Sequence, residues 1–140
     1  MKVVFVVLAL LILTGLPALA GCQELASPLE DYEWVLTSHG KYWEPLSVLP
    51  GTEITAFFDS ETKEVSGSAG CNSYFGSYEV DHLTLTITGP LGVTEMWCGE
   101  EKGEQERVYL EALQAAESFR LIQGGLRIEG NGWQLNYKRR

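Results

Sequence analysis

The stretch that decides the fold of this chain covers residues 66 to 78 and reads Ser66-Gly67-Ser68-Ala69-Gly70-Cys71-Asn72-Ser73-Tyr74-Phe75-Gly76-Ser77-Tyr78. It combines small residues, one cysteine and three aromatic side chains. Glycine lets a backbone turn sharply or approach another group closely. A cysteine in such a place is a nucleophile, a metal ligand or half of a disulfide. These alternatives separate an enzyme from a binding module.

The amino terminus predicts the compartment. A lysine at position 2 precedes an unbroken apolar run, residues 3–13, and small residues follow. This order is typical of a secretory signal peptide. The ending Leu19-Ala20-Gly21-Cys22 resembles the lipobox of prokaryotic lipoproteins, which implies that Cys22 is diacylated and becomes the mature N-terminus. An ordinary signal peptide and an uncleaved anchor helix stay open as alternatives.

We therefore predict a lipoprotein-type signal peptide at residues 1–21 and a polar tether at residues 22–31, followed by one domain at residues 32–138. The protein would lie in the cell envelope, anchored to the membrane through its N-terminal lipid and facing outside the cytoplasm. More than one acyl chain is needed for stable anchoring, and the lipoprotein modification supplies this.

The charge of the chain limits its partners. The chain has 10 basic and 19 acidic residues, and residues 1–21 contain one lysine and no acid. The remaining 119 residues therefore carry a formal charge of −10. Such a surface repels nucleic acids and anionic headgroups, so we expect no nucleic-acid partner.

The three cysteines predict one disulfide. If Cys22 carries lipid, Cys71 and Cys98 remain in an oxidising compartment, where two cysteines most often pair. Pairing would leave no thiol for catalysis or for zinc. The two histidines, His39 and His82, fall in predicted turns, where we expect them to be solvated. We expect no catalytic residues, no metal and no cofactor.

Hydrophobic patterning predicts an α+β fold. Residues 83–88 alternate apolar side chains with threonine, which is typical of a half-buried strand. Apolar positions at helical spacing predict one helix over residues 100–119, and prolines and glycines predict a loop over residues 38–51. Further strands are expected at residues 32–36, 53–58, 64–68, 74–80, 118–122, 126–128 and 133–137. We expect a curved, largely antiparallel β-sheet, a partial barrel, packed around one main α-helix.

Several segments together resemble the META domain, the family of the heat-shock lipoprotein HslJ. They are Trp34-Val35-Leu36, Phe58-Asp59, residues 65–72 with Gly70-Cys71-Asn72, residues 74–78, Thr94-Glu95-Met96-Trp97-Cys98, Glu104-Gln105-Glu106, Tyr109-Leu110, Leu126-Arg127-Ile128 and Trp133-Gln134-Leu135. The resemblance covers residues 32–137. In many members the residue before Cys98 is small, whereas here it is Trp97.

This HslJ-like resemblance implies an envelope domain linked to stress tolerance, including heat shock and resistance to drugs of the novobiocin type, and it supplies no catalytic residues. We therefore expect a non-enzymatic binding role, with an envelope protein or a small apolar molecule as partner. One alternative is an envelope inhibitor that blocks a lysozyme-like or protease-like enzyme with residues 38–51. A second is a carboxylate-dependent hydrolase. Aromatic residues are enriched at interfaces, so a possible binding surface comprises Tyr42, Trp43, Tyr74 and Tyr78.

Overall fold

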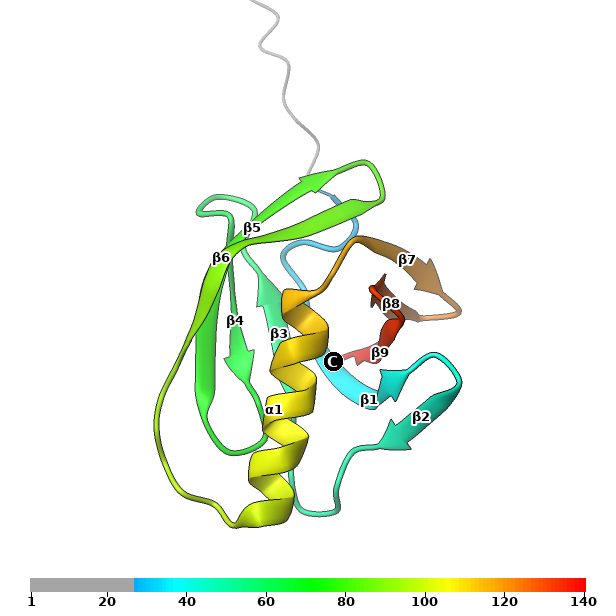
Figure 1. Cartoon of the computed structure of the whole chain (residues 1–140). Coiled ribbons are helices and arrows are strands. Elements are labelled where there is room, and N and C mark those ends of the chain that lie inside the picture. The colour runs from blue at the N-terminus through cyan, green and yellow to red at the C-terminus, as the bar shows by residue number, and fades with distance from the viewer. Residues whose placement is uncertain (1–26) are drawn as a thin grey trace, which may run out of the picture.

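The computed structural model describes residues 27–140, so the predicted signal peptide and Cys22 lie outside the described residues. Within them the chain forms nine strands and one helix (Figure 1). The elements are β1 Glu33–Lys41, β2 Glu44–Ser47, β3 Thr55–Phe58, β4 Glu64–Ser68, β5 Ser73–Asp81, β6 Thr84–Val93, α1 Glu100–Gln114, β7 Ser118–Ile122, β8 Gly125–Gly130 and β9 Trp133–Arg139. None of the helical segments in this range has the length and apolarity needed to cross a membrane.

All nine strands belong to one antiparallel sheet that curves until its ends meet. The strand order is β2-β1-β3-β4-β5-β6-β7-β8-β9, and β9 also pairs with β1. A register shift between Leu36 and Ser38 marks a bulge where β1 bends along β9. The expected curved, largely antiparallel sheet with one main helix is therefore present, and the β1–β9 pairing makes it a closed ring.

The helix is joined to the sheet by buried tyrosines. Gln105, Tyr109, Ala112 and Leu113 form the buried face of α1. The Tyr109 hydroxyl lies 2.8 Å from that of Tyr74 on β5 and accepts a hydrogen bond of 3.2 Å from that of Tyr137 on β9. Burial raises the pKa of all three hydroxyls well above its ordinary value, so they stay protonated and able to donate.

Two predicted elements were wrong in extent. The helix ends at Gln114, because residues 118–122 form β7 and place Phe119 opposite Ile128 of β8. The predicted loop at residues 38–51 instead contains the hairpin of β1 and β2, since four residue pairs from Ser38↔Ser47 to Lys41↔Glu44 are in register.

The start of the domain is fixed by a buried carboxylate. Glu30, which we expected in the tether, is 2% exposed. Its Oε1 accepts hydrogen bonds from Lys63 Nζ at 2.6 Å and from the Tyr78 hydroxyl at 2.5 Å, and its Oε2 accepts one from the Ser27 amide at 2.7 Å. Burial raises the pKa of Glu30, but these hydrogen bonds outweigh it and lower the pKa overall. The packed domain therefore begins before residue 32.

Candidate binding surface at the disulfide-linked loops

Three loops meet at the end of the molecule where α1 begins, at the bottom of Figure 1. They are the β2–β3 loop, residues 48–54, the β4–β5 loop, residues 69–72, and the β6–α1 loop, residues 94–99. We call these loops, together with the first two turns of α1, the loop end. Three sets of side-chain links, which we call fastenings, join these segments to one another.

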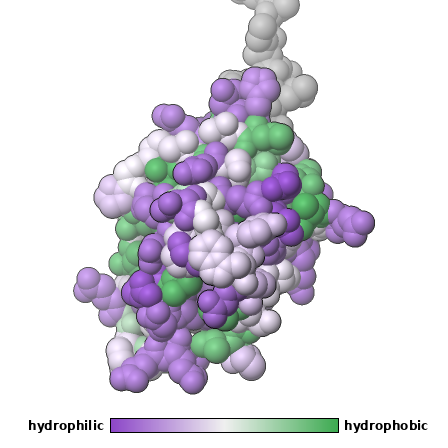
Figure 2. All heavy atoms as spheres, turned by 45° about the vertical axis from the view of Figure 1, so that its right-hand side comes forward, coloured by the Kyte–Doolittle hydropathy of each residue, from purple (hydrophilic) through white to green (hydrophobic). Residues whose placement is uncertain are grey.

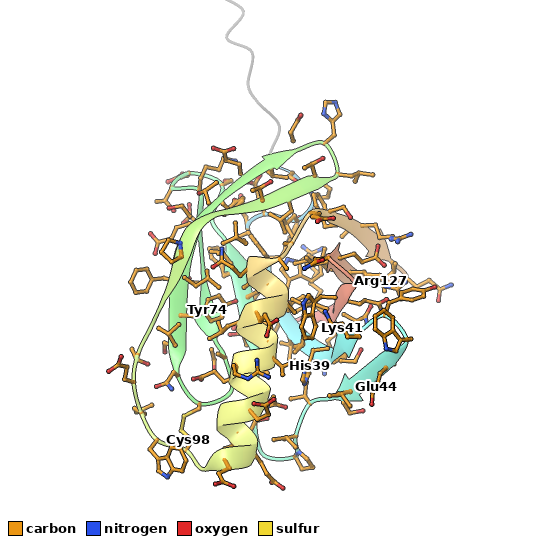
Figure 3. The ribbon with its side chains drawn as sticks, in the orientation of Figure 1. His39, Lys41, Glu44, Tyr74, Cys98 and Arg127 are labelled. Atoms are coloured by element: carbon orange, nitrogen blue, oxygen red, sulfur yellow. A yellow bond between two sulfur atoms is a disulfide. The ribbon has the colours of Figure 1, made fainter. Side chains whose placement is uncertain are left out.

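The first fastening is covalent. Cys71 in the β4–β5 loop and Cys98 in the β6–α1 loop form a disulfide, with their Cα atoms 5.9 Å apart, which confirms the predicted pairing (Figure 3). Both residues are half-buried. The pairing consumes both thiols, so the nucleophile and zinc alternatives for Cys71 lose their reactive group.

The second fastening is Asn72, which is 5% exposed. Its Oδ1 accepts hydrogen bonds from the Met96 amide at 2.7 Å and from the Thr94 hydroxyl at 3.0 Å. Its Nδ2 donates to the Met96 carbonyl at 3.1 Å and to Glu106 Oε1 at 2.9 Å. One amide side chain thus holds both backbone groups of Met96. Asparagine is the side chain of this length that carries both a carbonyl acceptor and an amide donor.

The third fastening comes from the helix. Glu106 Oε2 accepts a hydrogen bond from the Asn72 amide at 2.7 Å, so this carboxylate holds both the backbone and the side chain of Asn72. Gln105 is 5% exposed. Its Oε1 accepts from the Leu49 amide at 2.7 Å and its Nε2 donates to the Thr52 hydroxyl at 3.0 Å. Adjacent residues of α1 therefore hold two different loops.

These contacts give the Gly-Cys-Asn, Met-x-Cys and Glu-Gln-Glu motifs a physical role. Gly70 has φ +97°, a conformation that side chains rarely adopt, and an added Cβ would lie 3.1 Å from Gln105 Nε2. Glu104 is the exception, because it faces solvent and pairs with Arg107 at 2.7 Å. The other motif residues hold the loop end in one arrangement.

The loop end presents two apolar side chains to solvent. Met96 is 63% exposed and Trp97 is 81% exposed, although the Met96 backbone is held on both sides. Exposed acids flank them in sequence: Glu95, Glu100 and Glu101. Trp97 was not among the predicted binding residues. A large aromatic residue between Met96 and the disulfide cysteine Cys98 was the feature of the sequence that could have indicated it.

The predicted binding residues divide into two groups. Tyr42 and Trp43 are 70% and 74% exposed at the turn between β1 and β2. The β1–β2 hairpin lies on the right-hand side of Figure 1, which comes forward in Figure 2. Tyr74 and Tyr78 are 2% and 1% exposed, so their assignment to a binding surface was wrong. Both rings lie in the core, where the hydroxyl of Tyr74 also donates to the Thr55 carbonyl at 2.9 Å.

The turn that carries Tyr42 and Trp43 is held by β9. The Tyr42 amide donates to the Gly132 carbonyl at 3.0 Å, and an added Cβ on Gly132 would lie 3.8 Å from the Trp43 ring. Lys41 Nζ lies 3.6 Å from the centroid of the Trp133 ring, a cation–π contact (Figure 3). The structure thus keeps this aromatic turn ordered, on an element different from the loop end.

The two histidines differ from each other. His82 lies in the β5–β6 turn, exposed and 2.7 Å from Asp81, as its predicted turn position implies. His39 was also expected in a solvated turn, which is wrong: it is 3% exposed on β1, opposite Leu46 and Leu135. Its Nδ1 has no hydrogen-bond partner among the described residues, and burial lowers its pKa, so the ring is neutral. Within the same residues no group of three or more His, Cys, Asp or Glu side chains is placed to hold a metal ion.

Comparisons with known proteins agree with this architecture. No curated protein matches the chain. A structure described as the "NMR structure of the protein from Burkholderia xenovorans" is 29% identical over 80% of this chain and 83% of that one, with a TM-score of 0.68. The crystal structure of a DUF4847 family protein from Bacteroides vulgatus is 11% identical over 79% of this chain and 94% of that one, with a TM-score of 0.57, and shows the fold alone. The META domain matches residues 27–140, which include every fastening residue of the loop end. The chain therefore belongs to the META domain family.

Proposed function

We propose that this META-domain protein is a non-enzymatic, lipid-anchored module of the cell envelope that binds a partner protein through Met96 and Trp97 and serves in stress tolerance. The observation that carries the proposal is the combination of an 81% exposed Trp97 with a backbone held by a disulfide and by Asn72. A binding loop that is already ordered loses little conformational entropy on association. Tryptophan is also the residue type most enriched among the energetically dominant positions of interfaces.

The charge around these side chains indicates the chemistry of the partner. Glu95, Glu100 and Glu101 surround Met96 and Trp97 in the chain, and the domain as a whole is acidic. Complementary charge steers association and suppresses wrong partners. We therefore expect a partner segment that combines lysine or arginine with apolar side chains, rather than an acidic protein.

The position of the loop end also supports a protein partner. The described part of the chain begins at the top of Figure 1, whereas the loop end lies at the bottom. If Cys22 anchors the protein, we expect the loop end to face away from the membrane. An exposed tryptophan in that position is available to a protein and not to the lipid that holds the anchor.

The hydrolase alternative finds less support. A general acid at neutral pH needs a carboxyl group with a raised pKa. The pKa shifts of Glu30, Asp59 and Glu104 are downward, through hydrogen bonds from Lys63 and Tyr78, from backbone amides and from Arg107, respectively. These carboxylates therefore remain charged and act as acceptors within the structure.

One observation favours the inhibitor alternative. Tyr42 and Trp43 project from a tight hairpin turn that β9 holds in place, which is a suitable shape for insertion into an enzyme cleft. The two proposals place the binding residues on different elements. Single substitutions of Trp97 and Trp43 therefore distinguish them.

A peptide-binding experiment tests the proposal. The probe is a synthetic peptide that alternates lysine and leucine, and its counterpart alternates glutamate and leucine. We expect the first peptide to bind the purified chain and the second not to bind. Loss of the Trp97 side chain in Trp97→Ala should weaken binding by about 30-fold or more, since a dominant interface residue contributes at least ~2 kcal/mol.

The matched control is Trp43→Ala, which removes an equally exposed tryptophan. Unchanged affinity of Trp97→Ala would refute the role of the loop end. A loss confined to Trp43→Ala would instead favour the inhibitor alternative. In cells, Cys22→Ser should abolish acylation and membrane retention, and unchanged retention would refute the anchor.

A further inference from the structure

A row of polar side chains crosses the outer face of the sheet over β7, β8, β9 and β1. Arg120 on β7 lies opposite Arg127 on β8, Arg127 opposite Asn136 on β9, and Asn136 opposite Ser38 on β1. The neighbouring side chains on β8 and β9 are buried: Leu126, Ile128, Leu135 and Tyr137. Because successive side chains of a strand point to opposite faces, the row lies on the outer face of the sheet. Four strands therefore contribute one side chain each to a continuous line.

Hydrogen bonds within this row orient Arg127. Its Nε donates to Asn136 Oδ1 at 2.8 Å, and Asn136 Nδ2 donates to Ser38 Oγ at 2.9 Å. The donor and acceptor of Asn136 are both used, so its amide has one orientation. Among residues 27–140 the guanidinium of Arg127 is held through Nε, and its two terminal nitrogens have no hydrogen-bond partner there.

Only one of the two arginines forms an ion pair within the described part of the chain. Like charges directly opposite on neighbouring strands are destabilising. Arg120 is compensated by an ion pair with Glu129. Arg127 is half-buried and forms no ion pair with a carboxylate of the described residues, although the chain has nearly twice as many acidic as basic residues.

Arg127 lines a groove with the composition of an anion site. The groove has a volume of about 650 Å³ and lies between the β7–β8 turn and strands β9 and β1. Its polar side chains are those of Thr37, Gln123, Arg127, Asn136 and Lys138, and no carboxylate lines it. Figure 3 shows Arg127 on this part of the sheet. Within an acidic domain, the groove is a local region of positive charge.

We propose that this groove binds a phosphate-type oxyanion, with the terminal nitrogens of Arg127 donating two parallel hydrogen bonds and Lys138 supplying the second charge. The planar fork of a guanidinium matches two oxygens of a phosphate, and its orientation by Asn136 reduces the entropy lost on binding. The ligand is an inorganic phosphate or the phosphate of a phospholipid headgroup. The two sources share this chemistry.

Nuclear magnetic resonance of the purified chain tests the site through the Arg127 Nε–H signal. One titration uses inorganic phosphate and a second uses soluble dihexanoyl phosphatidylglycerol, both at constant sodium chloride. We expect a saturable shift of this signal in at least one titration, and the arm that responds at lower concentration identifies the source.

Backbone amide shifts of Gly124 and Gly125, which border the groove, give a readout that survives substitution of the arginine. Arg127→Gln should weaken binding by about tenfold or more, the loss expected for charge-assisted hydrogen bonds. Arg107→Gln is the matched control, because it removes one arginine from the exposed face of α1, and it should leave the affinity unchanged. Two results would overturn the proposal: no saturable shift with either ligand, or equal affinity of Arg127→Gln and the parent chain.

Discussion

The substitution Asn72→Asp tests whether the loop end is held by the hydrogen bonds described above. Aspartate has the shape of asparagine and keeps the acceptor that binds the Met96 amide and the Thr94 hydroxyl. It replaces the donor Nδ2 with an oxygen. That oxygen would face the Met96 carbonyl, now 3.1 Å from Nδ2, and Glu106 Oε1, now 2.9 Å away.

The magnitude follows from the two lost bonds. A neutral hydrogen bond contributes about 1 kcal/mol and one to a charged group about 1.5–3 kcal/mol, so the loss is about 2.5–4 kcal/mol. Repulsion between two carboxylates adds to this, although a proton shared between them limits the increase. We expect Asn72→Asp to lower the free energy of unfolding at neutral pH by about 3–4 kcal/mol.

The assay is urea unfolding under conditions that keep the disulfide oxidised, combined with hydrogen exchange of the Met96 amide. The matched control is Asn131→Asp, because Asn131 is exposed in the β8–β9 turn and its φ of 48° is one that aspartate tolerates. The control should change stability by less than about 0.5 kcal/mol. The difference should shrink in acid, where the new carboxyl group takes up a proton and can donate a hydrogen bond again. Equal stabilities of the two variants at neutral pH would refute this account of the loop end.

Three further changes test separate parts of the structure. Burial lowers the pKa of His39, so below about pH 6.5 the unfolded chain takes up a proton that the folded chain excludes, and the protein loses stability as the pH falls. In urea titrations, His39→Leu should reduce this loss between neutral pH and about pH 5. An unchanged dependence of stability on pH would contradict the prediction. Gly130→Ala should lower the free energy of unfolding by at least about 2 kcal/mol, because its Cβ would overlap the backbone that follows α1. Gly103→Ala, on an open face of the helix, should raise it by about 1 kcal/mol. Thermal melts measure both variants, and similar melting temperatures would refute the contrast. Replacing Cys71 and Cys98 together by serine should cost about 3–4 kcal/mol in the chain-entropy model for a separation of 27 residues, and a loss under ~1 kcal/mol would show that the hydrogen bonds hold the loop end alone.

Local pattern was enough for several features of this protein. The alternation of residues 83–88 predicted the strand β6, and apolar spacing predicted the helix that begins at Glu100. Cysteine parity predicted the Cys71–Cys98 pair. The motifs around residues 70–72, 96–98 and 104–106 indicated the META family, which matches residues 27–140. Each of these signals lies in a short window or in a count, so no distant contact was needed to recognise it.

The burial of individual side chains was harder to predict from the sequence, because it depends on which other segments of the chain cover them. Tyr42 and Tyr74 are both aromatic residues in strand-rich regions, yet one is 70% exposed and the other 2% exposed. Tyr74 is covered because α1, encoded 35 residues later, brings Tyr109 against it. His39 was expected in a turn but is buried, because β1 continues past its bulge and pairs with β9 near the end of the chain.

The amino-acid sequence by itself determined most of the strands, the start of the helix, the disulfide and the family, since these follow from periodicity and from residue identity. Only the tertiary structure decided that Asn72, Gln105 and Glu106 fasten three loops and that Trp97 is exposed at that end. It also decided that Arg127, opposite Arg120 in the sheet, lines a groove without carboxylates. The physical reason is that each of these features joins residues distant in the chain. Their contacts exist only after the sheet has closed on itself and α1 has packed against it.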